Sequence, residues 1–90
     1  MPEISRFYGI KIYLYFDDNE QHHKPHIHVF YGEYEVVIDF DGIVLAGSLP
    51  SKQYRLVSGW IALHEDELYR EWNEAVRGNK PNKISPLKKR

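Results

Sequence analysis

Four of the chain's five histidines lie close together, at His22, His23, His26 and His28. An imidazole has an ordinary pKa of about 6.5, so it can gain or lose a proton, or ligate a metal, near neutral pH. In an extended strand, residues two apart point to the same side with side chains roughly 7 Å apart. His26 and His28 therefore share one face, which makes this cluster the candidate site for proton transfer or metal binding.

Three hypotheses fit these residue types. In the first, His22, His26 and His28 bind a divalent metal such as zinc, which accepts three nitrogen ligands and a water molecule. In the second, His26 and His28 are the catalytic base and acid of a metal-free reaction, such as RNA cleavage through the 2′-hydroxyl group. In the third, the histidines are surface or interface residues without chemistry, and the spacing alone leaves all three open.

The elements that would position the cluster are strands. Apolar and polar residues alternate with a period of two in four segments that are rich in β-branched and aromatic residues, which is the pattern of strands with one buried face. The segments are bounded by glycine, proline and acidic residues, which favour turns. The expected strands span residues 10–16, 26–31, 34–40 and 43–46.

Two dipeptides predict the register of these strands. Gly32-Glu33 suits a two-residue type II′ turn, and Asp41-Gly42 suits a type I′ turn. The first turn places His26 opposite Asp39. A carboxylate beside an imidazole fixes its tautomer and stabilises its protonated form, so Asp39 is the predicted orienting residue of the catalytic hypothesis.

The second half of the chain predicts a helix. Residues 52–77 contain no proline and only Gly59 as a glycine, and their apolar residues form one broad stripe at helical spacing. Ser51 is the expected N-cap, and Gly78 is the expected C′ residue. A single helix of this length would be long for so small a domain, so a bent helix, or two helices that meet near residues 63–66, is the alternative.

These elements predict the α+β class. The expected fold is a four-stranded antiparallel meander with one long or bent C-terminal helix packed on its apolar face, which leaves the histidines on the opposite, polar face. Residues 1–78 would form a single domain, and residues 79–90 an extended basic tail whose Ile84 and Leu87 could dock onto that domain.

Composition narrows the classes of protein. The 90 residues allow one domain, and the absence of cysteine excludes disulfides and thiolate metal sites. No apolar run approaches the roughly 20 residues of a membrane span, and no signal peptide is evident, so we expect a cytoplasmic protein without a membrane partner. Residues 77–90 hold six basic and no acidic residues, whereas residues 1–76 carry a net charge of −7. The acidic body argues against broad phosphate binding by the folded part.

Nearly the whole chain resembles a prokaryotic family called domain of unknown function 4160. The most specific match is the histidine block, in which Lys24 and Ile27 replace the proline and phenylalanine usual in the family, with His22, His26 and His28 all in place. The matching motifs are Ile4-Ser5-Arg6-Phe7-Tyr8-Gly9-Ile10, His22-x-x-Pro25-His26-Ile27-His28, Tyr31-Gly32-Glu33-Tyr34, Gly47-x-Leu49-Pro50, Trp60, Leu68-x-x-x-Trp72 and Ile84-x-Pro86-Leu87.

The resemblance implies that the chain has a protein partner, and it says less about the reaction. Proteins of this family are often encoded beside a small protein of the domain of unknown function 2442 type, in what is regarded as a toxin–antitoxin pair. By this analogy the chain would be a toxin that acts on RNA, and its partner a small antitoxin. The analogy favours the nuclease hypothesis and an interface role for the polar sheet face.

Overall fold

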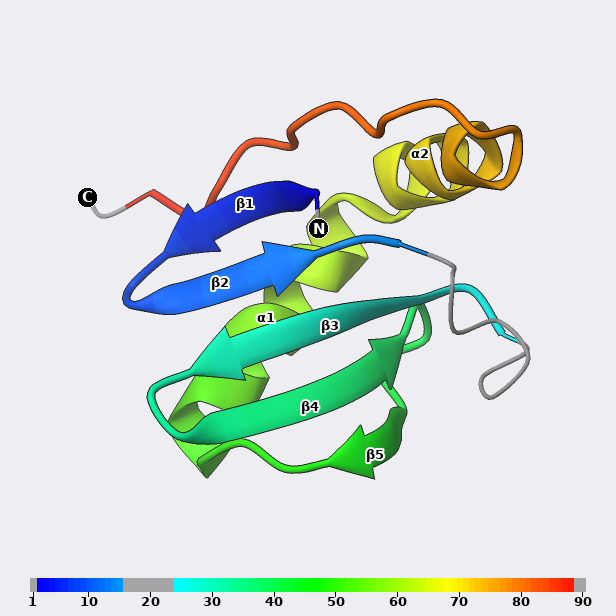
Figure 1. The fold of residues 1–90 in the computed structure, drawn as a ribbon. Helices are drawn as coiled ribbons and strands as arrows, with labels where there is room; N and C mark the ends of the chain where they lie inside the picture. The colour runs from blue at the N-terminus through cyan, green and yellow to red at the C-terminus, as the bar shows by residue number, and fades with distance from the viewer. Residues whose placement is uncertain (1, 16–23, 89–90) are drawn as a thin grey trace.

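The computed structural model describes residues 2–15 and 24–88, and within these ranges the chain forms five strands and two helices (Figure 1). The α+β class and the antiparallel sheet are confirmed, but the expected four strands and one helix were wrong. The sheet has the order β1-β2-β3-β4-β5, with each strand antiparallel to its neighbour. The strands are β1 (Glu3–Phe7), β2 (Ile10–Tyr13), β3 (His26–Tyr31), β4 (Tyr34–Asp39) and β5 (Val44–Gly47), and the helices are α1 (Ser51–Leu63) and α2 (Glu65–Val76).

Strand β1 is the element that the sequence did not predict. It joins β2 through a two-residue turn at Tyr8 and Gly9, which pairs Phe7 with Ile10. Both turn residues have positive φ, 51° and 77°, as a type I′ turn requires. Tyrosine seldom adopts this backbone conformation, and asparagine or aspartate is the usual residue at this position of such a turn. The sequence therefore did not reveal this hairpin.

The central hairpin has the register predicted from Gly32-Glu33. His26 pairs with Asp39, His28 with Val37, and Tyr31 with Tyr34. Gly32 has a φ of 56° and Glu33 does not have a positive φ, which fits the predicted type II′ turn. This hairpin fixes the positions of both central histidines.

The turn between β4 and β5 differs from the predicted type I′ turn. Only Gly42 has a positive φ, of 85°, and the Asp39 N–H donates to the Ile43 carbonyl across a three-residue loop. This loop places Ile38 opposite Val44, and the register shifts between Val37 and Ile38. The Asp39 carboxylate accepts hydrogen bonds from backbone N–H groups inside this loop, which explains why the wider loop replaces the tight turn.

Helix α1 covers one face of the sheet. In Figure 1, α1 lies behind the strands, while α2 lies beyond the upper right end of the sheet. The core between α1 and the sheet is apolar and contains Trp60, which is fully buried. Among the described residues, no helix is long and apolar enough to cross a membrane. The core residues contributed by strands β2 to β4 and α1 are Ile10, Ile12, Ile27, Val29, Val36, Ile38, Val57, Trp60 and Ile61.

The predicted helix is broken at His64, within the range where a bend was the alternative. His64 has φ −118° and ψ 23°, and it separates α1 from α2 without a proline or glycine. Three acidic residues occupy the first turn of α2, where negative charge favours a helix N-terminus, and one of them, Glu67, lies 2.7 Å from His64 Nδ1. This acidic triplet was the signal in the sequence for a new helix.

The predicted start of the first helix was wrong, and the predicted end of the second helix is confirmed. Pro50 occupies the N-cap position of α1 without a side-chain cap, and Ser51 is the first helical residue, so Ser51 is not the N-cap. Gly78 follows the C-cap of α2 with a φ of 89°, as predicted. Its N–H donates to Ala75 O and the Asn79 N–H to Glu74 O, which are the two hydrogen bonds of a Schellman motif.

Residues 79–88, here called the C-terminal strap, contain no helix or strand but run alongside β1 (Figure 1). The buried Glu71 carboxylate accepts a hydrogen bond of 2.8 Å from the Asn82 N–H. The Ile84 N–H donates to Ile4 O at 2.7 Å, and Ile84 is buried, so its predicted docking is confirmed. The strap therefore covers the outer edge of β1.

Candidate functional site

His26 and His28 lie on the same side of β3, as the spacing predicted, with ring centroids 5.1 Å apart. They differ from the prediction in burial. His26 is 0% exposed and His28 is 5% exposed, although the sequence indicated an open polar face. Any chemistry at these two rings therefore takes place in a packed environment.

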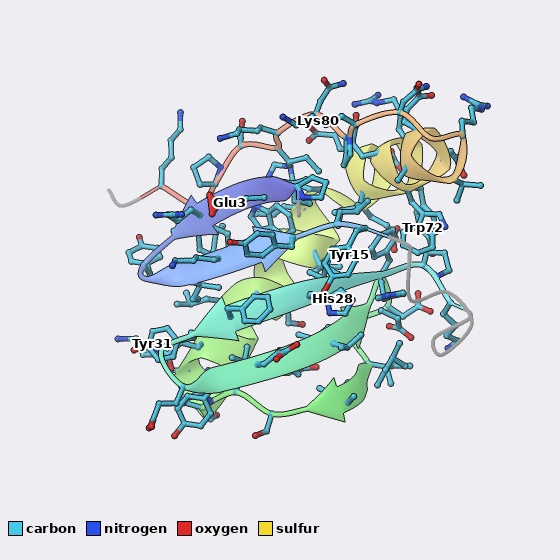
Figure 2. All side chains as sticks on the ribbon, viewed as in Figure 1. Glu3, Tyr15, His28, Tyr31, Trp72 and Lys80 are labelled. Atoms are coloured by element: carbon cyan, nitrogen blue, oxygen red, sulfur yellow. The ribbon has the colours of Figure 1, made fainter. Side chains whose placement is uncertain are left out.

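Two aromatic residues contribute to this burial. Tyr15, which follows β2, stacks on His28 with ring centroids 4.3 Å apart and an interplanar angle of 12°. Trp72 of α2 packs against His26 at 5.2 Å. Figure 2 shows Tyr15 and His28 on the front of the sheet and Trp72 at the side of α2. We call these four residues the aromatic–histidine cluster.

The role of Trp72 could not be found from the local sequence. Its helical spacing predicted a core residue, which is confirmed, because it is 7% exposed and packs on Phe40. The helix was expected to touch only the apolar face. Because the break at His64 places α2 beyond the strand ends, Trp72 reaches His26 as well. Only the tertiary arrangement reveals this contact.

The described hydrogen bond of His26 fixes its tautomer. His26 Nδ1 lies 2.6 Å from the Lys24 carbonyl oxygen. A carbonyl oxygen can only accept, so Nδ1 carries the proton. In the neutral ring, Nε2 then holds the lone pair, and it is the nitrogen that could act as a base or a ligand.

Asp39 stands opposite His26, as predicted, but its described contacts hold the β4–β5 loop. Oδ1 accepts hydrogen bonds of 2.9 Å from the N–H groups of Asp41 and Ile43. Oδ2 forms an ion pair of 3.2 Å with Lys24 Nζ. Asp39 therefore ties the loop, β4 and the residue before β3 together, a role that its turn position alone did not indicate.

These contacts also set the acidity of Asp39. Burial by itself raises the pKa of the Asp39 carboxyl. The hydrogen bonds, of which that from the Ile43 N–H is the strongest, outweigh burial together with Lys24 and hold the pKa below its ordinary value of 3.8. The ionised form therefore stabilises the folded state.

We expect this stabilisation to depend on pH with a definite sign. A carboxyl whose pKa is lowered by folding stabilises the protein above its unfolded pKa of about 3.9 and loses that contribution as the pH falls. Asp39→Asn should lower the free energy of unfolding by about 1–2 kcal/mol at neutral pH, with a smaller difference near pH 3. Urea unfolding at both pH values measures this. Glu33→Gln, at an exposed carboxylate, should have almost no effect at either pH, and a difference for Asp39→Asn that stays constant with pH would contradict the assignment.

The described residues alone do not form the metal site that the sequence predicted. Within residues 2–15 and 24–88, no three histidine, aspartate or glutamate side chains lie together as a possible metal site. The third predicted ligand, His22, falls outside these ranges. A metal site built on His22, His26 and His28 stays a prediction.

The sheet face opposite α1 carries a second aromatic contact. Tyr13 of β2 and Phe30 of β3 meet edge to face with centroids 5.4 Å apart, and both are half-buried. Lys11, directly opposite Phe30, and Glu35 on the neighbouring strand are exposed. Neither described helix lies over this front face (Figure 1).

Comparison with known proteins gave one finding. A family model with the description Domain of unknown function (DUF4160) matches residues 9–73. This range includes the aromatic–histidine cluster and every strand except β1. Comparison with curated proteins and with solved structures gave no match.

Proposed function

Because the chain belongs to the DUF4160 family, we propose that it is the toxin-like member of a two-protein module and that it acts by binding a small protein partner. The observation that carries this proposal is the front face of the sheet, where no described helix covers the half-buried Tyr13 and Phe30 rings. Aromatic rings surrounded by exposed charges are typical of protein-binding surfaces. The family resemblance supplies the two-protein context.

The burial of the histidines favours binding over catalysis. A general acid or base must come within hydrogen-bond reach of the proton that it transfers. His26 and His28 are almost fully buried, and ring contacts with Tyr15 and Trp72 hold them. We assign the aromatic–histidine cluster a supporting role, which is to hold β3 and the end of β2 in place beside the Tyr13 and Phe30 rings.

The proposal predicts that charge reversal on the front face weakens partner binding. The partner to test is a small protein of the domain of unknown function 2442 type, which the family resemblance implies, and the measurement is isothermal titration calorimetry. Lys11→Glu with Tyr13→Thr should weaken binding by at least about tenfold, since interface aromatic residues carry a large share of affinity. The control is Lys52→Glu, which makes the same charge change at an exposed position on α1.

The same variants test the toxin-like activity. Induced expression of the wild-type chain should arrest growth, and the front-face double variant, at equal abundance, should not. Equal binding by the front-face and Lys52 variants would contradict the proposed surface. Absence of growth arrest by the folded wild-type chain would contradict the toxin-like role.

A second candidate function is RNA cleavage by His26 and His28. It is favoured by their two rings lying 5.1 Å apart on one face, which is the pairing that an acid and a base require. In this hypothesis Asp39, which pairs with His26 on the neighbouring strand, would be the residue that orients the His26 ring. Incubation of RNA with wild-type protein and with His28→Gln tests it, and equal RNA integrity in both reactions would reject it.

A further inference from the structure

The two edges of the sheet are protected differently. The outer edge of β1 is covered by the C-terminal strap, whose Ile84 N–H donates to Ile4 O. On the same strand, Arg6 and Glu3 form an ion pair at 2.6 Å, and the register shifts between Glu3 and Ser5. Cover, charge and a bulge are the usual devices by which natural sheets block unwanted pairing.

Strand β5 forms the other edge and lacks two of these devices. No residue from Val44 to Gly47 is charged, and among the described residues no segment pairs with its outer side. Val44 is 43% exposed and the preceding Ile43 is 54% exposed. The outer backbone groups of an edge strand offer a row of hydrogen-bond donors and acceptors to an added strand.

The stretch of sequence that contains β5 carries acidic charges only. Residues 25–51, which include β3, β4 and β5, contain four acidic residues and no lysine or arginine. Glu33 and Glu35 are exposed at one end of β5, where the Ser48 N–H donates to Glu35 O at 3.2 Å. Asp41 is exposed at the other end, in the loop before Ile43. Carboxylates therefore flank an uncharged strand.

We propose that β5 is a docking edge for an extended, basic segment of a partner protein, which adds to the sheet as a further strand. Main-chain hydrogen bonds to β5 would give affinity, and cationic side chains near Glu35 and Asp41 would give orientation. This inference rests on the proposed function only in that it takes a protein as the partner. It names a surface different from the front face around Lys11 and Tyr13.

The charges decide against a second copy of this chain as the occupant. Both ends of β5 are acidic, so edge-to-edge pairing of two β5 strands would bring acidic ends of two molecules together in either direction, and like charges placed opposite each other destabilise a sheet. The strand is also short, and its register shifts near Val37 and Ile38, so only a few main-chain hydrogen bonds can form. We therefore expect micromolar affinity that falls as salt is added.

A designed peptide tests the edge directly. The probe is the peptide Lys-Val-Thr-Val-Thr-Lys with blocked ends, titrated into the full chain and followed by backbone amide chemical shifts. Two control peptides separate the contributions: one replaces both lysines with glutamate, and the other carries N-methyl groups on alternate backbone nitrogens. The protein control compares Glu33→Gln/Glu35→Gln with Glu65→Gln/Asp66→Asn, which removes two exposed charges from α2.

We expect the lysine peptide to shift the amides of Val44 to Ser48 and both control peptides to bind at least about tenfold more weakly. The Glu33→Gln/Glu35→Gln variant should weaken binding severalfold at low salt, and the α2 variant should leave it unchanged. Absence of binding, equal binding of the N-methylated peptide, or shifts centred on Lys11 would overturn the proposal. Concentration-dependent shifts of β5 in the free chain would also overturn it, in favour of a second copy. Loss of partner binding in the Lys11→Glu/Tyr13→Thr variant would still support the proposed function, so the two failures are distinguishable.

Discussion

Gly47→Ala is expected to lower the free energy of unfolding by about 3 kcal/mol or more, because two independent penalties fall on one position. Gly47 has a φ of 78°, which an alanine adopts at a penalty of about 1–2 kcal/mol. An added Cβ would also overlap the Glu35 carbonyl oxygen and lie 3.1 Å from Val36 Cα. The neighbouring atoms are backbone of β4, so they cannot move aside without breaking the β4–β5 pairing.

The chain contains a matched control for Gly47→Ala. Gly78 has a φ of 89°, but a Cβ there would meet nothing within 4 Å. Gly78→Ala therefore carries the backbone penalty alone and should lower stability by about 1–2 kcal/mol. Urea denaturation of both variants measures the difference. Equal destabilisation would show that the close approach of β5 to β4 is not required.

His26→Ala is the second large effect, with an expected loss of about 2–4 kcal/mol in the free energy of unfolding. The substitution removes a fully buried ring that contacts His28 and Trp72, and it removes the hydrogen bond to the Lys24 carbonyl. His26→Asn should recover part of the loss, because its amide nitrogen can take the place of Nδ1 as a donor to that carbonyl.

A second histidine provides the comparison. His64 is half-buried between the two helices and pairs with Glu67, so His64→Ala should lower stability by about 1 kcal/mol or less. Thermal unfolding of the three variants gives the ranking. A smaller effect at His26 than at His64 would show that the aromatic–histidine cluster does not support the fold. The expected ranking also means that growth assays with His26→Ala require proof of folding.

The parts of the fold that were predicted correctly depend on local rules. The β3–β4 register follows from Gly32-Glu33 and the alternation on either side, so His26 opposite Asp39 needed no tertiary information. The end of α2 follows from Gly78 in the same way. Strand β1 was missed because Tyr8 adopts a backbone conformation that is more common for other residues. The β4–β5 turn was predicted wrongly because the Asp39 side chain stabilises a wider loop.

The candidate site was only half predictable. Strand periodicity placed His26 and His28 on one face, and this placement is confirmed. Their burial was not predictable, since it depends on which segments from other parts of the chain pack against the two rings. Tyr15 closes over His28 from the end of β2, and Trp72 arrives from α2 because of a helix break whose angle the sequence does not encode in any simple pattern.

The strap along β1 has a consequence for how the protein folds during synthesis. The meander consists of neighbouring hairpins, and such contacts of low sequence separation form quickly. The hydrogen bond between Ile84 and Ile4, in contrast, closes a loop that spans nearly the whole described chain. On the ribosome, the β1 edge therefore stays open from the time the hairpins form until the segment around Ile84 has emerged. Throughout that interval the nascent chain exposes two pairing edges, and a chaperone would find β1 accessible only then.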